Sequence, residues 1–159
     1  TLSRKGSLMS YKRILVPYDG SQTSNKALVA ALDMAREHGG RVRVLHAIDE
    51  LAFASGYEYS GELVRIAREQ GQKILDDALA MAKSAGVEAD THLLSAPGKR
   101  LGDAVAQEAS AWQADLIVVG THGRRGLSRV LLGSGAESVI RLSTLPVLVI
   151  RGEDDGLGG

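Results

Sequence analysis

Apolar runs of strand length alternate with amphipathic runs of helix length along nearly the whole chain, and this alternation limits the fold more than any other feature. The apolar runs predict five strands, over Arg13–Pro17, Arg41–Ile48, Glu88–Ser95, Leu116–Gly120 and Leu145–Ile150. Helical periodicity predicts four helices between them, over about 21–38, 61–84, 101–112 and 136–143. Such alternation is typical of an α/β fold in which helices cover both faces of a parallel sheet.

Right-handed crossovers between parallel strands predict a single doubly wound five-stranded parallel sheet in the order 3-2-1-4-5, with two helices on each face. Leu116–Gly120 is the most apolar strand and should be central, whereas Glu88–Ser95 alternates with charged residues and should form an edge. Ser21 or Ser24 should cap the first helix, and Gly39 should end it. The long second helix should place these residues on its apolar side: Leu63, Ile66, Ile74, Leu75, Ala78, Leu79 and Ala82.

The bulk composition is that of an ordinary one-domain globular protein. The chain has 159 residues with 19 basic and 19 acidic side chains, and this balance argues against a general nucleic-acid-binding protein. Cysteine is absent, which excludes disulfides and thiolate chemistry, and no apolar run reaches the roughly 20 residues of a membrane helix. We therefore expect a cytoplasmic protein that binds neither nucleic acid nor membrane.

The two ends of the chain differ in character from the rest. Met9 is followed at once by a good strand, so we interpret it as the natural start and residues 1–8 as an artificial or disordered extension. The tail 152–159 is rich in Gly and Asp and should be flexible. The folded domain is thus expected over residues 9–151.

A glycine-rich stretch follows the fourth predicted strand and leads into the last helix. It carries Arg124 and further arginines, and no acidic residue lies between Asp115 and Glu137. Glycine lets backbone N–H groups approach a phosphate closely, and the pair Gly133–Ser134 stands at the positive end of a helix dipole. The stretch therefore predicts a polyphosphate site, although such loops can also serve only to turn the chain. Its glycines are Gly120, Gly123, Gly126, Gly133 and Gly135.

The turn after the first strand should meet this glycine-rich stretch. Strands one and four are neighbours in the predicted order, and ligands of such sheets bind beyond the carboxyl ends where the strand order reverses. Asp19 in this turn could accept hydrogen bonds from a base amine or a ribose hydroxyl, or it could close an Asx-turn before the helix; spacing alone favours neither. The backbone of Ala47, at the end of the second strand, could meet an adenine edge.

Signals for catalysis and for metal binding are weak. No lysine lies where a Walker motif needs one, and the four histidines show no metal-ligand spacing. A relay of Ser21, His122 and Asp19 lacks the nucleophile-elbow sequence. We therefore assign no catalytic residue and no metal ligand, and we interpret His122 as a phosphate contact or a packing residue of the loop.

Three ordered blocks of the chain resemble the universal stress protein family. Gly120-Thr-His-Gly123, nine further residues and Gly133-Ser134 match the family pattern Gly-x2-Gly-x9-Gly-Ser/Thr. Residues 14–21 match the first strand and turn of the family, and residues 145–150 match its last strand. The likeness extends over about residues 11–151. Two positions depart from the common pattern: Gly135, where an apolar residue is frequent, and Tyr18, where Thr or Val is frequent.

The resemblance implies an ATP site, because members that keep the full glycine pattern generally bind ATP. By this likeness Asp19 and the backbone around Pro17, Tyr18 and Ala47 hold the adenine and the ribose. The phosphates are expected on the glycine pattern and the residue after it, namely Gly120, Gly123, Gly133, Ser134 and Gly135. His122 and Arg124 are expected to line the same pocket.

The predicted function is that of an ATP-binding stress-response or regulatory protein that acts as a nucleotide-dependent dimeric switch without efficient catalysis. Mg²⁺ and other adenine nucleotides are further candidate ligands, and an unidentified regulatory protein is the expected partner. The family forms dimers through its last strand, and the apolar edge Val147–Ile150 agrees with this. Two alternatives stay open: a nucleotide-independent dimeric interaction module, and a slow ATPase for which Asp19 is the only obvious acid.

Overall fold

The computed structural model describes residues 10–48, 61–95, 100–121 and 134–152. The interpretations of residues 1–9 and of the tail 153–159 lie outside the described residues. The helices and strands are β1 (Arg13–Pro17), α2 (Gln22–His38), β2 (Arg41–Ile48), α4 (Gly61–Ser84), β3 (Glu88–Ser95), α5 (Leu101–Trp112), β4 (Leu116–Gly120), α6 (Ser134–Leu142) and β5 (Val147–Ile150).

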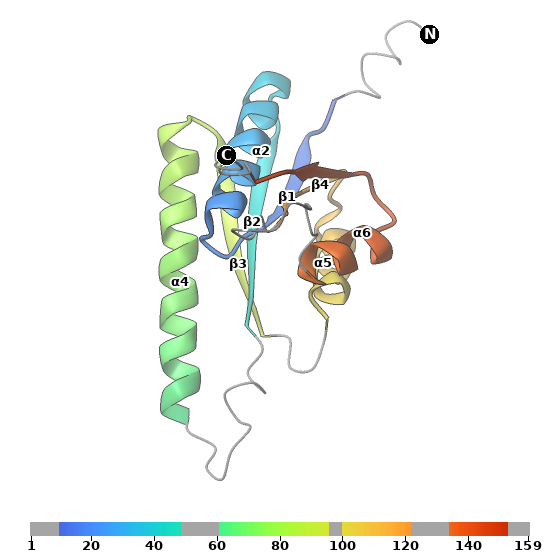
Figure 1. The fold of residues 1–159 in the computed structure, drawn as a ribbon. Coiled ribbons are helices and arrows are strands. Elements are labelled where there is room, and N and C mark those ends of the chain that lie inside the picture. Colours follow the sequence, from blue (N-terminus) through green and yellow to red (C-terminus); the bar gives the residue numbers. More distant parts are fainter. Residues whose placement is uncertain (1–9, 49–60, 96–99, 122–133, 153–159) are drawn as a thin grey trace, which may run out of the picture.

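The strands form one parallel sheet in the order β3-β2-β1-β4-β5, which confirms the predicted fold class. In the register, Ile14 of β1 lies opposite Val42 of β2 on one side and Leu116 of β4 on the other. Figure 1 shows α2 and α4 on one face of the sheet and α5 and α6 on the opposite face. The chain thus runs outward from β1 in one direction and then returns to run outward in the other.

The core consists of two layers that share β1. Ile14 and Val16 pack with α2 and α4 on one face, and Leu15 packs with α5 and α6 on the other. All three side chains are fully buried, which is why this strand reads as an unbroken apolar run. The second layer also contains Val105 of α5 and Val139 of α6.

The side of α4 that faces the sheet agrees with the prediction at Leu75, Ala78 and Ala82 and differs from it at three larger residues. Its buried stripe consists of Val64, Ala67, Gly71, Leu75, Ala78 and Ala82. Leu63, Ile66 and Leu79, which we placed on the apolar side, are 48%, 37% and 38% exposed. The prediction gave weight to the largest apolar residues. Small residues instead occupy the centre of the contact, because they let the helix lie close to the sheet.

The observed helix ends and strand ends mostly agree with the sequence signals. Ser21 caps α2, and its Oγ accepts a hydrogen bond from the N–H of Ser24 at 3.2 Å. Helix α6 begins at Ser134 and not at the predicted Ala136, so Ser134 and Gly135 belong to its first turn. Strand β5 begins at Val147 and not at the predicted Leu145. Leu145 lies in a turn, where its N–H donates to Ser143 Oγ at 3.0 Å.

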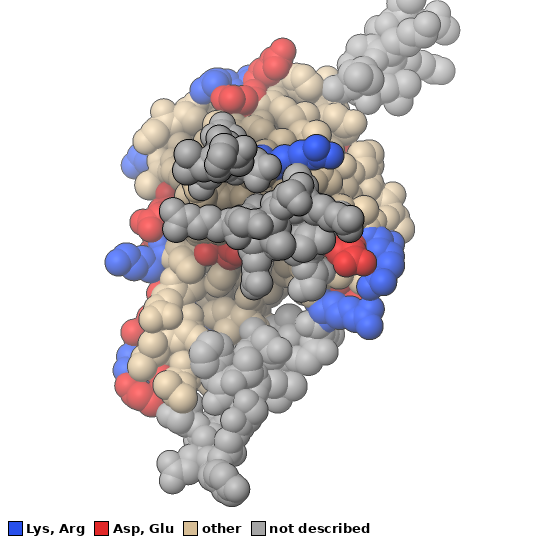
Figure 2. Space-filling view, viewed as in Figure 1, with Lys and Arg blue, Asp and Glu red and all other residues tan. Residues whose placement is uncertain are grey.

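Strand β3 lies at an edge of the sheet, as predicted, and ion pairs connect it to its neighbours. The guanidinium of Arg43 on β2 bonds to Asp90 of β3 and to Glu108 of α5, each at 2.8 Å. Figure 2 shows basic and acidic side chains interspersed over the described part of one face. The side chain of Asp90 is 55% exposed, so its pair with Arg43 contributes little to stability, whereas Glu108 is only 10% exposed and its pair with Arg43 is partly buried.

Leu15 offers a test of the central position of β1. We expect Leu15→Ala to lower the free energy of unfolding by about 2–5 kcal/mol, because the substitution removes fully buried methyl groups from the layer between β1 and the helices α5 and α6. Val29, which is 47% exposed on α2, is the matched control, and Val29→Ala should change stability by less than about 0.5 kcal/mol. Urea denaturation followed by circular dichroism measures both. Equal effects of the two substitutions would contradict the central placement of β1.

Candidate functional site

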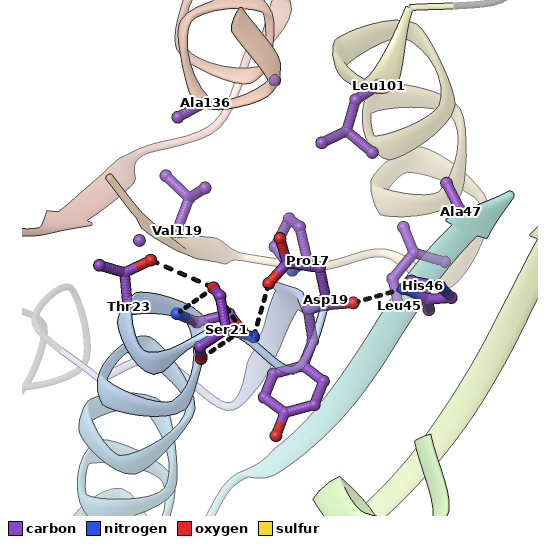
Figure 3. A pocket seen from close by; sticks show the side chains of 14 residues that line it. Pro17, Asp19, Ser21, Thr23, Leu45, His46, Ala47, Leu101, Val119 and Ala136 are labelled. Atoms are coloured by element: carbon purple, nitrogen blue, oxygen red, sulfur yellow. Dashed lines mark hydrogen bonds between the residues drawn. The ribbon is translucent and has the colours of Figure 1, made fainter. Parts of the chain in front are cut away.

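A cavity lies at the carboxyl ends of β1, β2 and β4, where the strand order reverses (Figure 3). This is the place at which doubly wound sheets bind ligands. It is formed because β1 and β4 pair directly, so that the segments that follow them leave the sheet side by side. The described residues that line it are Pro17, Tyr18, Asp19, Ser21, Thr23, Ser24, Leu45, His46, Ala47, Leu101, Val119, Gly120, Gly135 and Ala136.

The structure brings together most of the site residues that the sequence predicted. Six of them line the cavity: Pro17, Tyr18, Asp19, Ala47, Gly120 and Gly135. Ser134 is the first residue of α6, next to the lining residue Gly135. The remaining four predicted site residues, His122, Gly123, Arg124 and Gly133, lie outside the described residues.

Backbone hydrogen bonds to β2 hold the turn after β1 in place. The N–H of Tyr18 donates to the carbonyl oxygen of Leu45 at 2.8 Å. The carbonyl oxygen of Tyr18 lies 2.8 Å from Nδ1 of His46, which donates to it in the tautomer that carries a proton on Nδ1. Because both polar backbone groups of one residue are bound to β2, the position of the next residue, Asp19, is fixed relative to the sheet.

The side chain of Tyr18 belongs to the core and not to the cavity alone. It packs in the layer formed with α2 and α4, and its hydroxyl is hydrogen-bonded to Oδ1 of Asn25. Burial raises the pKa of the phenol, and the charges of Asp77 and Asp19 raise this pKa further. The large side chain at this position, unusual for the resembled family, therefore anchors the turn to α2.

Asp19 forms the Asx-turn that was one of its two predicted roles. Its Oδ1 accepts a hydrogen bond from the N–H of Ser21 at 2.9 Å, directly before α2. The residue is exposed and lines the cavity, and it is the only Asp, Glu, Lys or Arg among the described lining residues. A carboxylate suits donors such as hydroxyl and amino groups and repels phosphate. This part of the cavity is therefore suited to a neutral, hydrogen-bond-donating part of a ligand.

Gly120 has a packing role that the sequence did not reveal. A Cβ atom at this position would lie 2.5 Å from the carbonyl oxygen of Thr23 and 2.7 Å from its carbonyl carbon. Backbone atoms at that distance cannot move aside cheaply, so the end of β4 needs glycine in order to pass the first turn of α2. The close approach of two backbones explains this glycine without any ligand.

Sequence reasoning missed several lining residues. Thr23 and Ser24 add hydroxyl groups from the first turn of α2, and Leu101 adds an apolar side chain from the first turn of α5. The serine and threonine run after Asp19 was a usable signal, because such residues gather at helix starts. No sequence signal pointed to Leu101, because its distance from the other segments depends on how α5 packs.

In the described part of the chain, no group of three or more His, Cys, Asp or Glu side chains could hold a metal ion. None of the described helices has the length and apolar character that crossing a membrane requires.

Comparison with known proteins identifies the family. The family model described as the universal stress protein family matches residues 10–151. The chain belongs to the universal stress protein family. The family resemblance that we based on the glycine pattern and on the first and last strands of the chain is therefore confirmed.

Relatives and solved structures of the family agree with this assignment. Universal stress protein MJ0531 of Methanocaldococcus jannaschii is 37% identical over 143 residues, which cover 89% of this chain and 82% of the relative. A universal stress protein from Archaeoglobus fulgidus, solved in complex with dAMP, superimposes with a TM-score of 0.67 at 27% identity and covers 89% of this chain and 99% of its own. A universal stress protein in complex with cAMP superimposes with a TM-score of 0.65 at 26% identity, covering 91% and 99%.

The raised pKa of Tyr18 predicts a loss of stability in alkali. Above about pH 10 the unfolded chain releases the phenol proton while the folded protein still holds it, so stability falls as pH rises from there toward the folded pKa. Tyr18→Phe removes this contribution. We expect the free energy of unfolding of the parent, relative to that of the variant, to fall between about pH 9 and pH 11. Urea denaturation measures both free energies. A constant difference across this range would contradict the buried, proton-holding phenol.

Proposed function

We propose that this protein binds ATP in the cavity at the ends of β1, β2 and β4, and that the bound nucleotide regulates a dimer. The observation that carries the proposal is that an exposed carboxylate and the start of a helix line the same cavity. Asp19 lies at the end of β1, and Gly135 and Ala136 of the first turn of α6 line the same cavity. Relatives with the same fold have been solved with dAMP and with cAMP, which supports an adenine nucleotide as the ligand class.

The nucleoside fits the end of the cavity formed by β1 and β2. Pro17, Leu45 and Ala47 supply apolar contacts on which a flat base can lie. Asp19 supplies an acceptor for ribose hydroxyl or adenine amino groups, and the hydrogen bonds of Tyr18 to β2 hold this acceptor in position. The residues present therefore fit the adenosine part of ATP.

The phosphates fit the end of the cavity formed by α6. Helix N-termini present unpaired N–H groups and a positive partial charge, and the first turn of α6 lines the cavity through Gly135 and Ala136. We propose that Ser134 belongs to this phosphate site, together with Gly123, Gly133, His122 and Arg124 from the segment before it. Mg²⁺ would bind through the phosphates, as it usually does.

Regulation by binding is a better proposal than rapid hydrolysis. Phosphoryl transfer needs a group that orients the attacking water, and usually a carboxylate that holds Mg²⁺. Among the described lining residues Asp19 is the only acid, and its Oδ1 already accepts the N–H of Ser21. We therefore propose slow or no turnover, with the protein acting through a partner that responds to its nucleotide state.

The dimer is proposed to form through β5. In the described sheet β5 pairs with β4 and forms an edge, and Leu148 on it is 37% exposed. An apolar edge strand is a template for pairing with a second chain. The N–H of Thr121, directly after Gly120 of the cavity, donates to the carbonyl oxygen of Ile150 at 2.9 Å. This bond provides a short physical connection between the cavity and the proposed interface.

Binding of ATP and adenosine to three variants tests the nucleotide site. Asn keeps an amide oxygen for the Asx-turn but removes the charge, so Asp19→Asn should weaken both ligands by about tenfold, the loss of one charge-assisted hydrogen bond. Gly133→Val should weaken ATP alone by about tenfold or more, because it obstructs the phosphate end. Gly61→Val is the control, since a Cβ at Gly61 meets no atom within 4 Å. Isothermal titration calorimetry with and without Mg²⁺ provides the affinities.

Chromatography of the nucleotide after each titration measures hydrolysis. ATP recovered intact would agree with a regulatory binding protein, and rapid release of ADP would favour an ATPase. If the folded parent binds neither ATP nor adenosine, the proposed nucleotide site is wrong. A dimeric parent without binding would support the nucleotide-independent interaction module.

The oligomeric state of Leu148→Arg tests the proposed interface. We expect the parent to be a dimer and the variant a monomer, because two charged side chains would be buried against each other at the paired edge. Leu63→Arg is the control: Leu63 is 48% exposed on α4, away from β5, and the substitution should leave the dimer intact. Size-exclusion chromatography with light scattering reports the mass. A monomeric parent, or a dimeric L148R variant, would rule out pairing through β5.

A further inference from the structure

The first turn of α5 lies unusually close to the second turn of α6. A Cβ atom on Gly102 of α5 would overlap the carbonyl group of Ser138 of α6 and would lie 2.8 Å from its Oγ. Only a glycine at this position lets the backbones of the two helices come so close. The contact is buried: Ser138 is 5% exposed.

The hydroxyl of Ser138 joins the two helix starts. Its Oγ accepts a hydrogen bond from the N–H of Gly102 at 2.8 Å and donates one to the carbonyl oxygen of Gly135 at 2.9 Å. The first N–H groups of a helix have no partner within the helix, and the N-cap residue Arg100 makes no side-chain hydrogen bond to the first turn of α5. Ser138 therefore caps α5 from a different helix.

Both ends of this bridge are next to the cavity. Gly102 follows Leu101, whose side chain points into the cavity (Figure 3), and Gly135 is itself a lining residue. A Cβ atom on Gly135 would lie 2.8 Å from Cδ2 of Leu101, so this contact too depends on the spacing of the two helices. Apolar packing of Val105 against the layer that contains Val139 holds α5 and α6 together, and the buried hydroxyl of Ser138 fixes their first residues beside the cavity.

Helix α5 provides a rigid support for this bridge. Its residues Val105, Ala109 and Trp112 pack in the same buried layer as Leu15 and Ile117 of the sheet. The hydrogen bond that the N–H of Gly102 on α5 donates to Ser138 of α6 therefore helps to fix the start of α6 relative to the strands. The direction of the N–H groups in this first turn is fixed with it.

We infer that Ser138 is a positioning residue for the phosphate groups of the bound nucleotide: by bonding Gly102 and Gly135, it holds the first turn of α6 in the orientation that receives them. This inference rests on the proposed nucleotide site. Ser138 does not itself line the cavity, so it acts through the helix turn and not by contact with the ligand. A role confined to general stability would affect all ligands alike, whereas a positioning role affects the phosphate-bearing ligand.

The ratio of ATP affinity to adenosine affinity separates these roles. We expect Ser138→Ala to weaken ATP by about tenfold and adenosine by less than about twofold, because only the phosphate end of the cavity loses its support. Ser138→Thr keeps the hydroxyl and should keep the ATP affinity within about twofold of the parent. Isothermal titration calorimetry measures both ligands, and thermal unfolding establishes that each variant is folded.

Ser143→Ala is the matched control, directly after the last residue of α6. The Oγ of Ser143 also makes two hydrogen bonds, accepting from the N–H of Leu145 at 3.0 Å and donating to its carbonyl oxygen at 2.9 Å, but at the other end of α6. This variant should bind ATP and adenosine like the parent. In the nucleotide-free proteins, amide hydrogen exchange at Gly102 should accelerate in S138A and not in S143A, because S138A removes the acceptor of this N–H.

The outcomes distinguish the inference from the function on which it rests. Selective loss of ATP affinity in S138A, with faster exchange at Gly102, supports the positioning role. Unchanged binding, or equal weakening of ATP and adenosine, overturns that role while the nucleotide site stands. Failure of the parent to bind either ligand overturns the nucleotide site, and the positioning role with it.

Discussion

Parallel pairing of β1 with both β2 and β4 is the constraint on which the rest of the structure depends. Because β1 is buried on both faces and hydrogen-bonded on both sides, the chain has to leave it, build outward, and return to build on the opposite side. The segments after β1 and β4 then leave the sheet next to each other. The cavity is a consequence of this reversal, and the side chains around it give it its chemical character.

The shape of the cavity depends on places where backbones come unusually close. Gly120 lets the end of β4 pass the first turn of α2, and Gly102 lets α5 approach α6. Hydrogen bonds then fix each wall: those of Tyr18 to β2 on one side and those of Ser138 between the helices on the other. Tyr18 and Gly120 line the cavity themselves, whereas Gly102 and Ser138 support it from behind, which agrees with the general need for a preorganised site.

Family membership and physical reasoning contribute different parts of the functional proposal. The family match and the complexes of relatives point to adenine nucleotides as a class. The positions of Asp19 and of the first turn of α6 support the proposed binding orientation of the nucleotide, with its nucleoside at β1 and its phosphates at α6. The hydrogen bond from Thr121 to Ile150 adds a physical link from the cavity to the edge strand.

The sequence by itself determined the order of strands and helices, the parallel sheet and the meeting of the segments after β1 and β4, because periodicity and chain connectivity are local properties. It also predicted that Asp19, Gly120 and Gly135 lie at the site. Only the tertiary structure decided which residues of α4 face the sheet and that Ser138 bonds α5 to α6. It also showed that Gly120 has no room for a Cβ atom, because the backbone of Thr23 lies next to it. These features depend on distances between segments remote in sequence, which are set by how complete helices pack and leave no local signature.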